Sequence, residues 1–193
     1  MRLGKAILAV VGATVVLAGL VGTASAGRLS TSSLGMKAVW SRLDFSGGFG
    51  TIECEVVVEG SFHERTIAKS VGTLSGFITS ATITRCARGG ATVLRETLPW
   101  HIQYRSFTGT LPNISGISAT VISPSFRIRE PFGVSCLANR SNVILTFTRE
   151  ASGAITAAGV SGRASCEGIE GELGGSTTNV NNGSGTRVTV TLI

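Results

Sequence analysis

The chain carries few residue types that could do acid–base chemistry. It has two histidines, His63 and His101, and a single aspartate, Asp44. His101 lies in the segment "TLPWHIQYRS" (97–106), which also holds one of the two tryptophans and the only tyrosine. A catalytic histidine needs a carboxylate that orients it and stabilises its charge. An extracellular hydrolase that uses His101 with a carboxylate is therefore one hypothesis.

The two-residue period of this segment favours another role for His101. Trp100, Ile102 and Tyr104 share one face of a strand, while His101 and its polar neighbours share the other. This pattern predicts buried aromatic rings and an exposed histidine. An arginine-rich polar face could bind the carboxylates or phosphates of a polymer. The candidate binding face consists of Arg95, His101, Gln103, Arg105, Arg127 and Arg129.

Other chemical signatures are weak. The chain contains no G-x-S-x-G nucleophile elbow, no phosphate-binding G-x-x-x-x-G-K-[ST] loop and no G-x-G-x-x-G motif. Glu53, Glu55 and Glu59 alternate along one run, which is typical of the solvated face of a strand. We therefore assign no catalytic residues and expect no cofactor, and a non-catalytic protein is favoured over an enzyme.

Four cysteines are present, Cys54, Cys86, Cys136 and Cys166. No two of them have C-x-x-C spacing and only two histidines could complete a ligand set, so no metal site is expected. An even number in an exported chain favours disulfides, for which three connectivities are open. The pairs Cys54–Cys86 and Cys136–Cys166 are favoured on locality alone, since each closes a loop of about 30 residues and stabilises by roughly 3–4 kcal/mol.

The N-terminus predicts export. Arg2 and Lys5 precede an apolar run at 6–21, and small residues follow at Ala24 and Ala26. This order is that of a secretory signal peptide, with cleavage expected after Ala26. The run has about 16 residues, fewer than the roughly 20 that span a bilayer. We therefore expect a secreted, extracellular protein, either free or associated with the cell surface, without a stable transmembrane span after cleavage.

The charge is positive but scattered. The chain has 17 basic and 11 acidic residues, and removal of Arg2 and Lys5 leaves a mature net charge of +4. A nucleic-acid site would need clustered basic residues, so no nucleic-acid partner is expected. An anionic cell-wall polymer or another envelope protein is the expected partner.

Alternating strands recur through the mature chain. "TIECEVVVE" (51–59), "NVILTFTR" (142–149) and "TRVTVTLI" (186–193) each place apolar residues at every second position, and Gly, Ser and Asn clusters separate such runs. We predict an all-β fold, an antiparallel β-sandwich or small β-barrel of about ten strands, after an N-terminal signal-peptide helix. The domains are a signal peptide at 1–26, a flexible leader at 27–36 and a single β domain at 37–193. The Gly-rich segment 171–186 is expected to form a loop or a long hairpin turn before the final strand.

One strand changes phase. In residues 116–130 the apolar positions are odd up to Val121 and even from Ile122 onward. A β-bulge near Val121–Ile122 is expected to keep the apolar face buried.

Four stretches resemble exported β-rich proteins of high-GC actinobacteria, a family with no assigned activity. They are "SFHERTIAKSVGTLSG" (61–76), "TVLRETLPWHIQYRSFTGTLPNISGI" (92–117), "PFGVSCLA" (131–138) and "TRVTVTLI". The resemblance implies export, β structure and paired cysteines, and it assigns no functional residue.

Three functions remain as hypotheses. The favoured one is a secreted or cell-envelope-associated, non-catalytic β-module with a binding or structural role. The second is the hydrolase that uses His101. The third is a membrane β-barrel subunit, because the chain ends in a strand, although aromatic girdles are missing from the sequence.

Overall fold

The structure is a computed structural model that describes most of residues 28–193. The predicted signal peptide and its helix lie outside the described residues, as do the side chains of 157–159, 164–166, 169 and 170. The described residues are 28–48, 50–110, 113–130, 133, 135–138, 141–166, 169–175 and 178–193.

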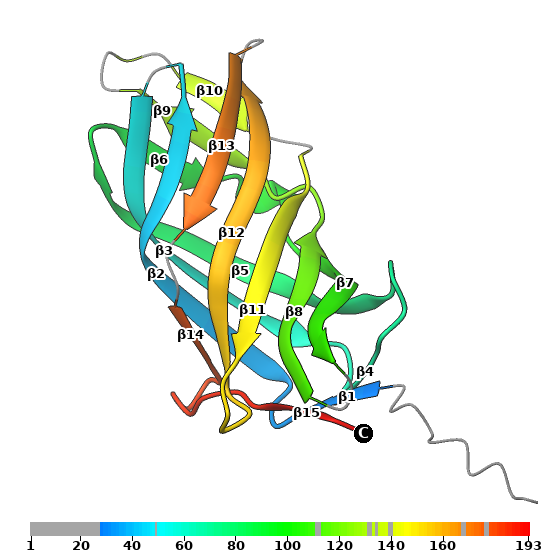
Figure 1. The fold of residues 1–193 in the computed structure, drawn as a ribbon. Coiled ribbons are helices and arrows are strands. Elements are labelled where there is room, and N and C mark those ends of the chain that lie inside the picture. The colour runs from blue at the N-terminus through cyan, green and yellow to red at the C-terminus, as the bar shows by residue number, and fades with distance from the viewer. Residues whose placement is uncertain are drawn as a thin grey trace, which may run out of the picture.

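Eight long antiparallel strands close into a barrel (Figure 1). In circular order they are β2 (Gly35–Gly47), β3 (Gly50–Phe62), β5 (Leu74–Ala87), β7 (Trp100–Thr110), β8 (Asn113–Val121), β11 (Val143–Arg149), β12 (Ile155–Cys166) and β13 (Ile169–Gly175). The barrel closes because β12 pairs with β11, and β13 pairs with both β12 and β2. The predicted all-β class is confirmed, and the architecture is the barrel alternative.

Short strands form a small sheet at each end of the barrel, as Figure 1 shows. At the upper end, β9 (Phe126–Arg129) pairs with β6 (Gly90–Val93) and with β10 (Ser135–Ala138). At the lower end, β1 (Arg28–Thr31) pairs with β4 (Thr66–Ala68) and with β15 (Val190–Leu192). A short 3-10 turn, η1 (Arg95–Thr97), connects β6 to β7. In the part of the chain that the structure describes, no helix could span a membrane.

The alternation predicted from sequence holds in the barrel wall. On β3, Ile52, Cys54 and Val56 are each 1% exposed, whereas the glutamates between and beyond them face outward. The same parity buries Val143 and Leu145 on β11, while Thr146 and Thr148 are exposed. The buried apolar residues of the barrel strands form a single interior core, and their burial favours closure of the barrel.

A disulfide joins Cys54 on β3 to Cys86 on β5, which confirms this predicted pair. The two residues are direct cross-strand partners in the antiparallel register of β3 and β5. Cys136 on β10 is also disulfide-bonded. Its predicted partner, Cys166, ends β12, but the side chain of Cys166 lies outside the described residues, so that pair remains a prediction.

The phase change after Val121 has a different cause from the expected β-bulge. β8 ends at Val121, residues 122–125 form no strand, and β9 then belongs to the upper sheet. Ser123 has a φ of 48°, which turns the backbone between the two sheets. The predicted bulge near Val121–Ile122 is therefore wrong, since the apolar residues change parity where the chain changes sheet.

Two segments expected to be irregular form strands. The supposed leader contains β1, and β2 already begins at Gly35. The supposed loop at 171–186 contains most of β13 and all of β14 (Thr178–Asn181), and β14 pairs with β2 and β12. At the end of β13, position 175 favours glycine, because a Cβ on Gly175 would lie 2.6 Å from the Leu43 Cδ1 atom. The low β-propensity of the segment is overridden by the strands on either side of it.

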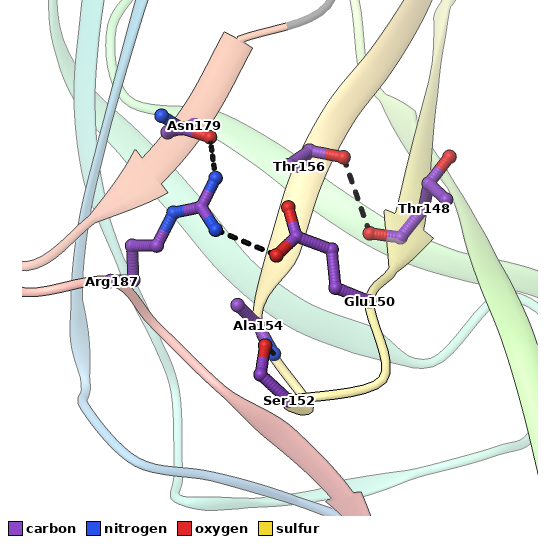
Figure 2. A network of polar contacts seen from close by, with 7 residues as sticks. All are labelled: Thr148, Glu150, Ser152, Ala154, Thr156, Asn179 and Arg187. Carbon is purple, nitrogen blue, oxygen red and sulfur yellow. Dashed lines mark hydrogen bonds and ion pairs between the residues drawn. The ribbon is translucent and has the colours of Figure 1, made fainter.

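A polar network fastens the C-terminal segment to the β11–β12 hairpin (Figure 2). The Arg187 guanidinium forms a 2.7 Å salt bridge with Glu150 and donates a hydrogen bond to Asn179 of β14. Nearby, the Arg149 side chain donates to the Val190 carbonyl oxygen at 2.8 Å. These contacts bring residues about 40 positions apart together and hold the lower end of the barrel closed.

Candidate functional site

The β7 strand places its aromatic residues inside the barrel and His101 outside it. Trp100 and Tyr104 are 3% and 4% exposed, and burial raises the pKa of the Tyr104 hydroxyl. The Trp100 ring packs edge-on against Phe126, with a centroid distance of 5.3 Å, and its Nε1 donates to the Thr97 hydroxyl. His101 and Arg105 are exposed, as predicted. The aromatic residues therefore belong to the core, and only the polar face of β7 is open to a ligand.

Neither histidine is arranged for acid–base catalysis among the described residues. No hydrogen bond or salt bridge joins His63 or His101 to a described carboxylate. The His63 ring instead lies 5.2 Å, centroid to centroid, from the Phe77 ring. No three described His, Cys, Asp or Glu side chains gather as a metal-binding group.

The predicted acidic face of β3 is neutralised by basic residues. Glu53, Glu55 and Glu59 form salt bridges of 2.8, 3.1 and 2.7 Å with Arg42, Arg85 and Lys37, respectively. Arg42 also donates to Asp44 at 3.0 Å, and this hydrogen bond, followed by the charges of Asp44 and Glu53, raises the pKa of Arg42. The carboxylates thus lie on the outer surface of the sheet, where they form ion pairs. This agrees with their interpretation as the solvated face of a strand.

The candidate binding face divides into two patches. The β7 patch consists of His101, Gln103 and Arg105, and the β9 patch consists of Arg127 and Arg129. The two strands belong to different sheets, and Arg95 lies on η1, between β6 and β7.

The arginines of these patches are exposed and carry unneutralised charge. Arg95, Arg105, Arg127 and Arg129 form no salt bridge with any described residue. Glu96 and Glu130 follow two of them in the chain but lie beyond ion-pair distance. The guanidinium groups of these four arginines are therefore available to an external anion.

Two features escaped the sequence analysis. A hollow of about 490 Å³ opens on the barrel wall beside the β11–β12 seam, with Asn142, Arg163 and Glu172 in its lining. Inside the barrel, the Trp40 Nε1 atom is buried and has no hydrogen-bond partner in the part of the chain that the structure describes, although tryptophan N–H groups usually have one. The sequence offered no signal for either, because both depend on strands that meet only when the barrel closes.

Comparison with known proteins adds no relative. No protein-family model, curated protein or solved structure matches the chain.

Proposed function

We propose that the mature chain is an exported, non-catalytic β-barrel module of the cell envelope that binds anionic polymer through its outer surface. The observation that carries this proposal is the contrast between paired and unpaired charge. The acidic groups of β2 and β3 are paired with basic partners, whereas Arg95, Arg105, Arg127 and Arg129 are exposed and unpaired among the described residues. Guanidinium groups of this kind make charge-assisted hydrogen bonds to carboxylates and phosphates.

The absence of a His–carboxylate pair among the described residues supports binding rather than hydrolysis. His101 is exposed on the outer face of β7. The predicted signal peptide and the Cys54–Cys86 disulfide support export, because disulfides persist outside the reducing cytosol.

The polarity of the barrel supports a module surrounded by water. Membrane barrels carry an apolar band outside and a polar interior. In this barrel the interior is apolar, whereas the outer faces of β2, β3 and β5 carry salt bridges such as Lys37–Glu59 and Arg85–Glu55. This arrangement favours the envelope module over the membrane-barrel subunit.

Cosedimentation of the mature protein with protein-free cell-wall sacculi tests the proposal. We expect that Arg95→Ala with Arg105→Ala, or Arg127→Ala with Arg129→Ala, weakens binding by about tenfold, and that the quadruple variant loses it. Binding of the wild type falls as salt is added. The matched control is Arg85→Ala with Arg187→Ala, which removes two arginines whose charges are already paired. Binding that survives the loss of all four unpaired arginines overturns the proposal.

A further inference from the structure

A row of hollows leads from the outer wall into the barrel. The open hollow beside the β11–β12 seam shares Ser141, Arg163, Glu172 and Leu173 with a first cavity of about 30 Å³. That cavity lies between the barrel wall and the upper sheet, since Phe45 of β2 and Phe126 of β9 also line it. The route from solvent thus begins at polar residues and narrows between aromatic rings.

Three more cavities continue the row inside the barrel. The second cavity, of about 40 Å³, shares Pro124, Phe126, Val143 and Leu173 with the first. The third, of about 30 Å³, shares Trp40, Val58, Ile78 and Leu145 with the second. The fourth, of about 40 Å³, shares Met36, Ile102, Phe147 and Val180 with the third. Each neighbouring pair is therefore separated by only a few side chains.

The row is long and narrow. Phe45 lines the first cavity and Met36 lines the third and fourth, and the two residues lie nine positions apart on β2. That interval is roughly 30 Å of strand, or roughly 23 Å along the axis of a barrel whose strands tilt by about 40°. Each cavity is close to the volume of one water molecule, about 30 Å³. The cavities together are much smaller than a long acyl chain, so a slender chain enters the row only as the core side chains between the cavities move aside, and a bulky ring system requires a larger displacement.

The lining selects an apolar guest with one acceptor atom. Empty apolar cavities stay dry and cost stability, which an apolar guest restores. The second and third cavities are lined mainly by apolar side chains, and Trp40 lines both. Its Nε1 hydrogen has no partner among the described residues, so a buried donor is left unsatisfied there. A carbonyl or hydroxyl oxygen on the guest would satisfy it.

We propose that the barrel interior binds an amphiphile with one long acyl chain and an anionic head, and with an oxygen atom part-way along the chain. The chain occupies the row of cavities, and the Trp40 Nε1 donates to its oxygen. The head lies at the outer hollow, where the exposed Arg163 forms no salt bridge with any described residue. The interior of an eight-stranded barrel is either just filled by side chains or holds one small ligand, and here core side chains fill it around the cavities. This inference goes beyond polymer binding and uses residues on another part of the barrel.

Fluorescence of bound cis-parinaric acid tests the site. Trp40 and Trp100 are the only tryptophans, and both line the second cavity. A parinaric chain in the barrel must therefore accept energy from them. We expect transfer on excitation of tryptophan, displacement by stearic acid, and about tenfold stronger displacement by a mid-chain hydroxystearic acid. We also expect bound stearic acid to raise the Tm by about 5–10 °C at a hundredfold excess over Kd.

Three variants separate the parts of the proposal. Arg163→Ala weakens binding of stearic acid but leaves stearyl alcohol unchanged, while the matched control Arg105→Ala changes neither. Trp40→Phe removes the preference for the hydroxylated chain, and Trp100 still reports binding.

Absence of energy transfer in the wild type overturns the proposal, as does transfer that stearic acid does not displace. Equal affinity of wild type for the plain and hydroxylated chains contradicts the role of Trp40. Cosedimentation with sacculi is expected to be unaffected by Arg163→Ala. If the wild type binds parinaric acid but not sacculi, the proposal of polymer binding has failed. If it binds sacculi but not parinaric acid, the proposal of an interior acyl-chain site has failed.

Discussion

The direction of each side chain on its strand decides the role of most polar residues in this protein. His101 and Trp100 are neighbours in sequence, yet one is exposed and the other is in the core, and the two-residue period predicts this difference. The same rule predicts the outward row of Glu53, Glu55 and Glu59. It cannot predict the unpaired Trp40 N–H or the outer hollow, because neither follows from the residues next to it in the chain.

Close strand contacts demand glycine at particular residues. A Cβ on Gly60 would lie 2.2 Å from the Phe77 carbonyl oxygen, a backbone atom with no freedom to move, beside a register shift between β3 and β5. We expect Gly60→Ala to lower the free energy of unfolding by about 2 kcal/mol or more, measured by urea denaturation. Gly35→Ala is the matched control, since nothing lies within 4 Å of its Cβ position. Equal stability of the two variants would contradict the packing of β3 against β5.

At the scale of elements, strands with clear alternation were predictable and the glycine-rich ones were not. β3 and β11 follow the period closely, and each has one dry face and one wet face. β13 is rich in glycine and β14 carries threonine and asparagine, and both are strands because β2 and β12 supply hydrogen-bonding partners on both sides. Around Ser123 the sequence showed the change of phase correctly, but a bulge and a change of sheet shift the apolar positions in the same way.

The Cys54–Cys86 disulfide ties β3 to β5 across a sequence separation of 32 residues. On the chain-entropy model, closing such a loop stabilises the fold by roughly 3–4 kcal/mol. We expect Cys54→Ala with Cys86→Ala to lower the free energy of unfolding by about that amount, measured by guanidinium denaturation of the oxidised proteins. The paired variant Cys136→Ala with Cys166→Ala, measured alongside, tests the second predicted disulfide. An unchanged denaturation midpoint in the Cys54/Cys86 variant would show that this bond contributes nothing to stability.

At the scale of the whole molecule, alternation alone could not separate a sandwich from a barrel. Both architectures bury one face of every strand. The difference lies in which distant strands meet, and the pairings β11–β12 and β13–β2 decide it. Closure creates the enclosed apolar interior, and it leaves the unpaired arginines of β7 and β9 on the outside. The two proposed binding sites therefore both follow from the closed barrel, one from its inside and one from its surface.

The most direct test of this account is a crystal structure of the mature protein with a fatty acid that carries bromine at the end of its chain. Anomalous scattering locates the bromine without reference to the rest of the density. We expect one bromine peak inside the barrel, among Met36, Ile102 and Phe147, with the carboxylate beside Arg163. A bromine peak on the outer surface, or an interior that excludes the chain while the ligand is bound elsewhere, would contradict it.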